Sequence, residues 1–247
     1  MLPLSEDLNA NWRFEYKYRL TYHQYYRIRS AILPYMKKDG YSLATPGGRY
    51  FVRSLYFDSD DFRNYEEKIN GDSERIKLRI RTYKSSSEKD DDLRVELKAR
   101  KGITMEKHST WIKNAFYHEF MKTRHWPISH DAILEEFERY LHLKTLWPKI
   151  IVEYEREGFT SRGMENIRVT FDHKVRSTRA ASLYPDYPLF RPHHPGLIVL
   201  EIKCNKTQPG WLRPLVQQQG LCLITNSKFA QGIEIARPEL VRSSWSN

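Results

Sequence analysis

Two segments of the chain place charged side chains at every second position, the spacing at which side chains share one face of a β-strand. The segments are RIKLRIRTY from Arg75 and LRVELKARK from Leu93. The face that they predict is basic and contains a single glutamate: Lys77, Arg79, Arg81, Arg94, Glu96, Lys98 and Arg100. Arg offers paired donors to phosphate oxygens. The pattern therefore predicts a surface that holds an oligoanion, with phosphate as the leading candidate.

The same alternation recurs in RFEYKYRL from Arg13, IRVTFD from Ile167 and VLEIK from Val199, each with an apolar opposite face. One such stripe alone would fit an antiparallel sheet that is solvated on one side. Several stripes of long basic residues favour a bound polyanion instead, because clustered like charges repel one another unless an anion neutralises them. A carboxylate among them would bind a divalent cation that bridges phosphate oxygens.

The composition agrees with an anionic partner. The chain has 247 residues, 41 Lys and Arg against 31 Asp and Glu, and a net charge of +10. A hydrophobic content of 40% is enough for a real core. No internal repeat or linker divides the chain, so we expect a single domain over residues 1–247.

The two cysteines, Cys204 and Cys222, are too few for a disulfide scaffold and lack metal-ligand spacing. The start of the chain has no basic and apolar leader, and nowhere do 18 apolar residues run together. These features predict a cytoplasmic protein without a transmembrane segment. A membrane partner stays open because the chain is so basic.

The positions of the alternating and helically spaced residues predict an α+β fold with a closed or strongly curved antiparallel sheet and helices covering its outer wall. Thr21 is the expected N-cap of a helix that reaches about Met36. The expected strands are 14–20, 50–57, 75–83, 93–101, 103–110, 149–157, 167–175 and 197–204. The further expected helices are 62–69, 112–123, 131–142 and 211–219.

At these residues the sequence resembles the triphosphate tunnel enzymes, and within them the polyphosphate polymerase domain of the vacuolar transporter chaperone (VTC) complex and its bacterial single-domain relatives. Eight pieces carry the resemblance in order along nearly the whole chain: FEYKY, SLYFDSDDFRNY, KLRIRTY, ELKARK, EYEREGF, RVTFD, LEIK and SKF. The resemblance implies an eight-stranded antiparallel β-barrel around a basic tunnel. It also implies transfer of the γ-phosphate of ATP, or of another nucleoside triphosphate, to polyphosphate with Mn²⁺ or Mg²⁺.

The resemblance also implies roles for particular residues. Arg79, Arg81 and Lys98 would stabilise the transferred phosphoryl group, and Glu201 would bind the metal. The further phosphate ligands would be Lys17, Arg156, Lys228 and Ser227, with Lys107 and Lys203 as additions. Two questions stay open. Asp172 and Glu15 either join the metal shell or pair with neighbouring Arg and Lys, and we favour pairing. Alternation alone does not decide on which side of its strand Arg156 lies.

Two positions depart from the wider pattern. Arg13 stands where the tunnel phosphatases and cyclases typically have the first glutamate of an ExExK motif, which favours a polymerase over a hydrolase. Thr225 stands where the polymerases would carry another basic residue. The alternatives are a metal-dependent triphosphatase or polyphosphatase, and a non-catalytic polyphosphate sensor.

A nucleic-acid-binding barrel is disfavoured, because the 33 aromatic residues (Phe 11, Trp 6 and Tyr 16) do not interleave with the basic stripes. We therefore expect no nucleic-acid partner. His193 and His194 lie in a Pro-rich segment without a second ligand pair, so we expect a surface loop there rather than a metal site.

Overall fold

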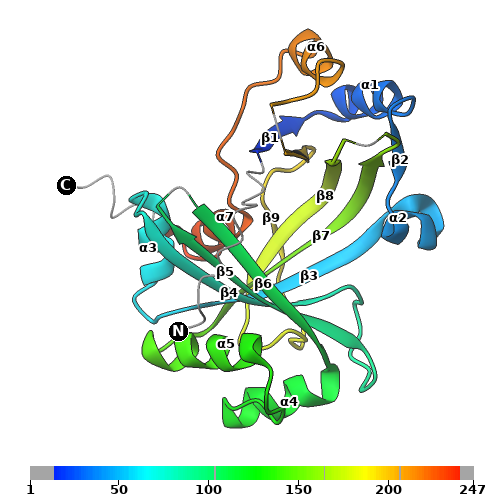
Figure 1. Cartoon of the computed structure of the whole chain (residues 1–247). Coiled ribbons are helices and arrows are strands. Elements are labelled where there is room, and N and C mark those ends of the chain that lie inside the picture. The colour runs from blue at the N-terminus through cyan, green and yellow to red at the C-terminus, as the bar shows by residue number, and fades with distance from the viewer. Residues whose placement is uncertain (1–13, 103, 164, 206, 240–247) are drawn as a thin grey trace. The chain divides into compact units, whose positions relative to one another are not determined.

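A computed structural model describes residues 14–102, 104–163, 165–205 and 207–239 (Figure 1). The described chain forms two compact units. The first takes its residues from Met1–Phe51, Tyr154–Val175 and His194–Asn226, and the second from Val52–Glu153, Arg176–His193 and Ser227–Asn247. Strands β7 (Trp147–Ser161) and β8 (Ile167–Arg179) contribute residues to both units.

In the first unit the strand order is β1-β10-β8-β7, with the short strand β2 paired with β7. The strands are β1 (Phe14–Leu20), β2 (Met36–Lys38) and β10 (Ile198–Cys204), together with parts of β7 and β8. The helices are α1 (Tyr22–Ile32), α2 (Gly40–Ala44) and α6 (Leu212–Gln218), with a 3-10 turn at Pro46–Gly48. The pairs β1–β10, β10–β8 and β2–β7 are antiparallel.

In the second unit the order is β7-β3-β4-β5-β6, and β9 pairs with the end of β8. The strands are β3 (Tyr50–Asp58), β4 (Glu74–Thr82), β5 (Asp92–Lys101), β6 (Thr104–Lys113) and β9 (Arg191–Pro192). The helices are α3 (Arg63–Ile69), α4 (Asn114–Thr123), α5 (Ala132–Leu143) and α7 (Lys228–Ala236). The pairs β3–β4, β4–β5, β5–β6 and β8–β9 are antiparallel.

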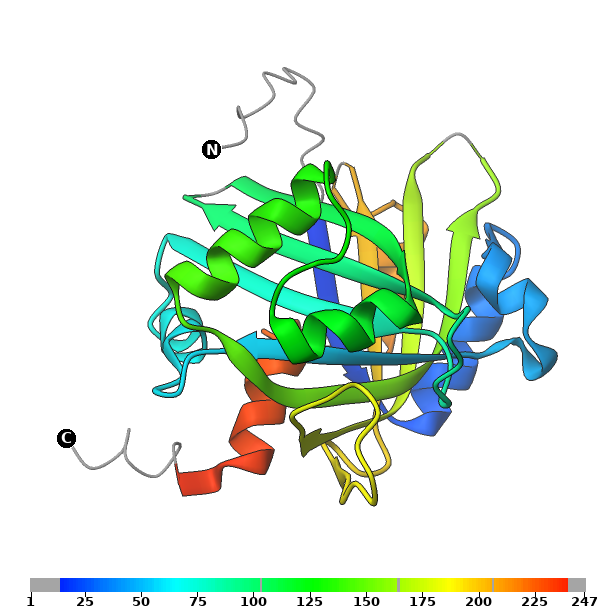
Figure 2. The ribbon, with the colours of Figure 1, turned by 90° about the horizontal axis from the view of Figure 1, so that it is seen from below.

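Each unit has its own hydrophobic core on the apolar face of its strands. In the first, Leu20 and Leu200 pack with Ile28 of α1 and Leu212 of α6. In the second, the apolar residues of β4 and β5 pack against α4 and α5, which cover this face of the sheet (Figure 2). The α+β class predicted from the sequence, with antiparallel strands and helices on the apolar face, is confirmed.

Helix α1 begins where the sequence predicts and ends earlier. Thr21 caps it, because the Thr21 hydroxyl accepts from the backbone N–H of Gln24 and the Gln24 side chain accepts from that of Thr21. The prediction that this helix reaches Met36 is wrong, since α1 ends at Ile32 and Pro34 lacks the N–H that would continue the helical hydrogen bonds. Met36 lies in β2, but it is fully buried, so its predicted place in the core is right.

The helix expected over 112–123 also begins later than predicted. Ile112 pairs with Leu93 in the β5–β6 ladder, so α4 starts only at Asn114. Strand β7 is longer than the expected 149–157 at both ends. None of the helices between residues 14 and 239 is both long and apolar enough to cross a membrane.

Candidate functional site

The strand register of the second unit brings its alternating charged residues onto one face. Arg79 of β4 lies opposite Glu96 of β5, and Arg81 lies opposite Arg94. Glu96 in turn lies opposite Ser109 of β6. We call this surface the basic face and define it by seven residues: Lys77, Arg79, Arg81, Arg94, Glu96, Lys98 and Lys107. Six of the seven are cations, so the face carries a large excess of positive charge.

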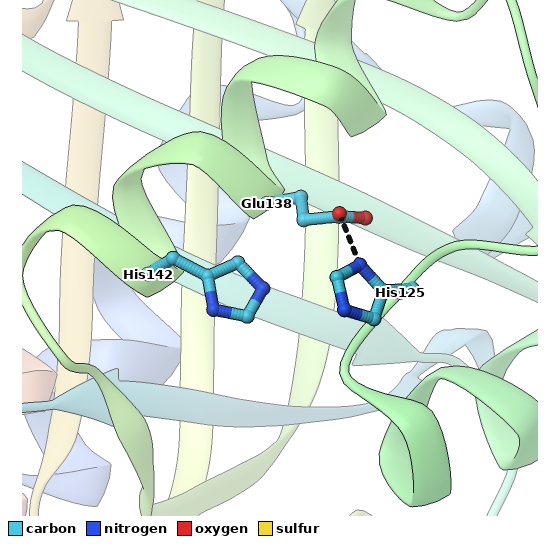
Figure 3. A group of neighbouring side chains, drawn as sticks. All are labelled: His125, Glu138 and His142. Atoms are coloured by element: carbon cyan, nitrogen blue, oxygen red, sulfur yellow. Dashed lines mark hydrogen bonds and ion pairs between the residues drawn. The ribbon is translucent and has the colours of Figure 1, made fainter.

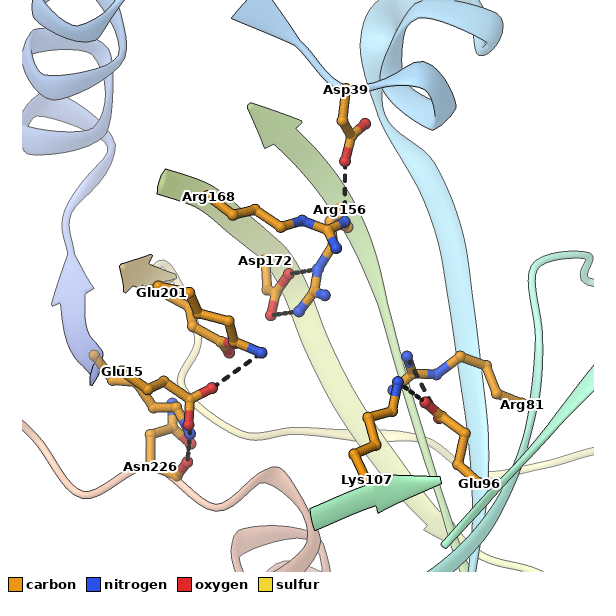
Figure 4. A network of polar contacts seen from close by, with 12 residues as sticks. Glu15, Asp39, Arg81, Glu96, Lys107, Arg156, Arg168, Asp172, Glu201 and Asn226 are labelled. Carbon is orange, nitrogen blue, oxygen red and sulfur yellow. Dashed lines mark hydrogen bonds and ion pairs between the residues drawn. The ribbon is translucent and has the colours of Figure 1, made fainter. Parts of the chain in front are cut away.

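Glu96 contacts three of these cations, and Figure 4 shows two of them, Arg81 and Lys107. Its Oε2 lies 2.5 Å from Arg79 Nε and 3.7 Å from Arg81 Nη1, and Lys107 Nζ contacts its Oε1. The Glu96 side chain is only 1% exposed. Burial raises the pKa of Glu96, but Arg79 and Arg81 outweigh burial and hold this pKa well below its usual range.

Three lysines form a row across the basic face. Lys77 of β4 lies directly opposite Lys98 of β5, and Lys98 lies directly opposite Lys107 of β6. Like charges at directly opposed positions destabilise an antiparallel pair. Burial lowers the pKa of Lys107 to about 8, although Glu96 opposes this shift. An anion bound over the row would relieve the repulsion.

The pKa of a buried tyrosine, Tyr56, depends on the charges of the basic face. Tyr56 of β3 lies opposite Arg79, and its hydroxyl accepts a hydrogen bond of 3.1 Å from Arg79 Nη1. Burial raises the pKa of Tyr56, but the charges of Arg79, Arg81 and Lys228 outweigh burial, so the pKa is lowered overall. The potential at the Tyr56 hydroxyl is therefore strongly positive.

Ser227 and Lys228 lie at the start of α7, beside the same face. Ser227 is the N-cap of this helix, and its hydroxyl accepts from Ala230 N at 3.4 Å. Lys77 Nζ lies 3.3 Å from the Ser227 hydroxyl and 4.8 Å from the centre of the Phe229 ring. The start of α7 thus lies next to the Lys77 end of the lysine row.

The first unit carries a second charged face, which we call the mixed face. Glu15 of β1 lies opposite Lys203 of β10, and Lys17 lies opposite Glu201. Across the next ladder Glu201 lies opposite Thr170 of β8. Because side chains alternate along a strand, one surface carries these residues together: Glu15, Lys17, Arg168, Thr170, Asp172, Glu201 and Lys203. Acidic and basic side chains are interspersed here, in contrast to the basic face.

Lys203 joins two carboxylates of the mixed face. Its Nζ lies 3.3 Å from Glu15 and 2.8 Å from Glu201, whose side chain is 9% exposed. Burial lowers the pKa of Lys203, but Glu201 and Glu15 outweigh burial and raise it. Lys17 lies 3.3 Å from Glu15 and donates to the backbone oxygen of Asn226 at 3.0 Å.

Arg156 of β7 binds Asp172 through two parallel contacts (Figure 4). Arg156 Nε and Nη2 lie 2.6 and 2.8 Å from the Asp172 oxygens, and Asp172 is fully buried. Burial lowers the pKa of Arg156, but Asp172 outweighs burial and raises this pKa well above its usual value, with a further contribution from Glu201. The structure thus shows that Arg156 lies on the side of β7 that meets Asp172, a question that the alternation left open. Asp172 pairs with Arg156, and Glu15 pairs with Lys17 and Lys203.

On the opposite side of β7, Glu153 and Glu157 form ion pairs with arginines of neighbouring elements. Glu157 binds Arg29 at 2.9 Å and accepts from the Tyr25 hydroxyl at 2.7 Å. Glu153 lies 2.7 Å from Arg53 and 2.6 Å from Arg176. Both carboxylates are buried. Their partners come from the same unit in each case, so these pairs hold β7 in place.

The mixed face has donors that fit a hard divalent cation. Such a cation takes oxygen ligands, and Glu201 supplies a carboxylate, while Glu15 and Asp172 of the same face pair with basic residues. The hydroxyl oxygen of Thr170, opposite Glu201, is buried and has no hydrogen-bond partner among the described residues. Lys203 Nζ already lies between two of the carboxylates, at a position where positive charge is stabilised. The residues present therefore fit the predicted metal.

The predicted site residues divide between the two faces. The basic face carries Arg79, Arg81, Lys98 and Lys107, with Ser227 and Lys228 beside it, and the mixed face carries Lys17, Glu201 and Lys203, with Arg156 paired to Asp172. Thr225 is exposed, and Arg13 lies outside the described residues. His193 Nδ1 lies 3.4 Å from Gln231 of α7. Sequence reasoning missed Tyr56, Thr170 and Asn226, of which Tyr56, in SLYFD, and Thr170, in RVTFD, lay in quoted motifs.

Comparison with solved structures shows the fold. A protein from Bacillus halodurans, provisionally assigned as an adenylate cyclase, is 13% identical with a TM-score of 0.52, over 86% of this chain and 92% of that chain. A protein from Pyrococcus horikoshii OT3 is 11% identical with a TM-score of 0.46, over 91% of this chain and 99% of that chain. No protein of curated function matches the sequence significantly. The model of the VTC domain matches residues 12–237, and the chain therefore belongs to the VTC domain family.

Proposed function

We propose that this protein is a phosphotransferase that moves the γ-phosphate of ATP, or of another nucleoside triphosphate, to the end of a polyphosphate chain. The observation that carries the proposal is the row of Lys77, Lys98 and Lys107, three opposed cations on a face with one carboxylate. Opposed like charges destabilise an antiparallel pair, and an anion of repeating charge bound over the row would relieve that repulsion. Polyphosphate has that form.

Membership of the VTC domain family supports a function connected with polyphosphate or a triphosphate. The proposed reaction is a direct transfer. A terminal oxygen of the chain forms a bond to the γ-phosphorus, the bond from that phosphorus to the β–γ bridging oxygen breaks, and ADP leaves with that electron pair. The polymer becomes one phosphate longer.

The basic face supplies what phosphoryl transfer requires, which is positioning and stabilisation of negative charge. Arg79 and Arg81 present guanidinium groups to non-bridging oxygens, with their orientation fixed by Glu96, Tyr56 and Ser54. Lys98 adds a point charge in the middle of the row. We assign these three cations as the catalytic residues and Lys107, Ser227 and Lys228 as further phosphate ligands.

The mixed face supplies Lys17, Arg156 and Lys203 as further cations and Glu201 as the metal ligand. A divalent cation, Mn²⁺ or Mg²⁺, would neutralise charge on adjacent phosphate oxygens when bound. Glu15 and Asp172 stay on their basic partners in this assignment. Arg156 is firmly oriented, since Asp172 holds it through two contacts.

A metal-dependent triphosphatase is the second candidate, in which water takes the place of the polymer end. The lowered pKa of Lys107, about 8, favours this candidate, because a lysine that loses its proton near this pH can accept one from water. Both reactions use the same phosphate ligands. A non-catalytic sensor would keep those ligands and lack turnover.

The test is to incubate purified protein with ATP and MnCl₂ and to resolve the products on a gel. We expect acid-labile polyphosphate together with ADP, and no polymer from Arg81→Ala or Glu201→Gln. Arg139→Ala is the matched control, because this arginine lies on α5 and pairs with Glu136. Release of orthophosphate in equal amount to ADP, without polymer, would contradict the polymerase and support the triphosphatase. Tight binding of polyphosphate without formation of ADP would support the non-catalytic sensor.

A further inference from the structure

We propose that His125, Glu138 and His142 form a binding site for a transition-metal ion of the zinc class (Figure 3). Each of the three side chains offers one ligand atom, and these atoms all lie within 4.8 Å of one another. The site belongs to the second unit and shares no residue with the basic face or the mixed face.

Helix α5 and the segment that follows α4 bring the three residues together. Glu138 and His142 are one turn apart on α5, so they project from the same side of the helix. His125 follows Arg124, the residue in left-handed conformation that ends α4. The rings of His125 and His142 face each other with centroids 5.2 Å apart, and His125 Nδ1 lies 2.6 Å from Glu138 Oε1.

The backbone around His125 is fixed before any metal binds. The Thr123 hydroxyl accepts from His125 N at 3.2 Å and lies 3.0 Å from His125 O. Glu138 Oε2 accepts from Trp126 N at 3.0 Å, and the Trp126 ring stacks on Phe120 with centroids 3.8 Å apart. On the other side of His125, His142 Nε2 of α5 lies 3.2 Å from Arg124 O, so contacts on both sides hold the ligand-bearing segment against α5.

The spacing of the ligand atoms fits a tetrahedral ion after a small movement. Bonds of about 2.1 Å at tetrahedral angles place ligand atoms roughly 3.4 Å apart. Closing from 4.8 Å requires rotation of the His125 and His142 side chains, and both are exposed. The same exposure lets an ion enter and leaves room for water in the fourth position.

The donor set selects the class of metal. Two imidazoles and one carboxylate favour Zn²⁺, and also Cu²⁺ or Ni²⁺, over ions that prefer oxygen alone. The proposed metal of the mixed face would instead meet carboxylates and a hydroxyl, which suit Mn²⁺ or Mg²⁺. A zinc-class ion at His125 would fasten the segment after α4 to α5 and so stabilise the folded second unit.

The experiment is a calorimetric titration of the full chain with ZnCl₂. We expect His142→Ala to weaken one Zn²⁺ site by at least about tenfold, and Glu138→Gln to weaken the same site. The Glu138→Gln variant keeps an oxygen that can accept from Trp126 N, so it tests the ligand charge without releasing the segment. His23→Ala is the matched control, because His23 is an exposed histidine of α1. Circular dichroism without metal checks that each variant is folded.

Glu201→Gln separates this site from the proposed function. This variant lacks the carboxylate assigned to the metal of the mixed face. The Zn²⁺ site that His142→Ala weakens should therefore keep its affinity in Glu201→Gln. Unchanged zinc affinity in folded His142→Ala would overturn the proposal and leave only an ion pair between His125 and Glu138. An equal loss in His23→Ala would also overturn it, because the binding would then be that of scattered surface histidines.

Discussion

Lys98 lies directly opposite Lys77 across the β4–β5 ladder, a pairing of like charges that an antiparallel sheet ordinarily avoids. The next position across the sheet is Lys107, so the arrangement is repeated. Glu96 is the one carboxylate among the seven residues that define the basic face. Because this repulsion would be relieved by a bound polyanion, we expect a polyanion to stabilise the folded second unit.

Lys98→Met should weaken polyphosphate binding without destabilising the protein. Methionine keeps an unbranched apolar stem and removes the charge. We expect tripolyphosphate to bind about tenfold more weakly, while the free energy of unfolding without ligand stays the same or rises by about 0.2–1 kcal/mol. Calorimetry and urea unfolding measure the two quantities. Lys122→Met on α4 is the control. A clear loss of stability without ligand would show that Lys98 is a structural residue.

Glu96→Gln should destabilise the second unit. The substitution leaves Arg79, Arg81 and Lys107 around a neutral group, and removal of one partner from a buried ionic network costs about 3–5 kcal/mol. Urea unfolding at neutral pH measures this loss. A free energy of unfolding equal to that of the wild type would contradict the proposal that Glu96 stabilises this group of cations.

The lowered pKa of Glu96 predicts that the free energy of unfolding depends on pH under acidic conditions. The pKa of Glu96 is lowered in the folded protein, so its stabilising contribution is present above the pKa of the unfolded chain, about 4.3. This contribution is lost as the pH falls further toward the folded pKa. The stability gap between wild type and Glu96→Gln should therefore narrow on acidification below about pH 4. A difference in unfolding free energy that does not change with pH would show that the ionisation of Glu96 does not contribute to stability.

Lys107 should make phosphate binding depend on pH near 8. Burial lowers its pKa to about 8, so the lysine loses its charge as the pH rises through this value. We expect the affinity for tripolyphosphate to fall between about pH 7 and 9 in the wild type. The decline should be smaller in Lys107→Arg, because arginine keeps its charge throughout. Identical pH profiles for the two proteins would assign the decline to another group.

Tyr56 should ionise at lower pH than an ordinary tyrosine. The charges of Arg79, Arg81 and Lys228 lower its pKa in spite of burial. Ultraviolet titration of the wild type, with Tyr56→Phe subtracted, should show one phenol that ionises below about pH 10. Added tripolyphosphate should raise this pKa, because a bound polyanion cancels the positive potential. A pKa that tripolyphosphate leaves unmoved would place the anion away from the basic face.

The sequence by itself determined which residues share a face. Alternation is a local property of a strand, so KLRIRTY and ELKARK already place Arg79 with Arg81 and Glu96 with Lys98. Local capping chemistry likewise fixed the start of α1 at Thr21. The resemblance carried by the eight motifs also predicted the family that the domain comparison shows.

Only the tertiary structure decided which charged residues meet. Register sets Lys77 against Lys98, and it depends on pairing between strands rather than on either strand alone. The contact of Lys77 with Ser227 joins residues 150 positions apart. The side of Arg156 was undecided until β7 paired in the sheet and Asp172 lay within reach. Local spacing cannot predict such pairs, because they follow from how distant segments bury their apolar faces.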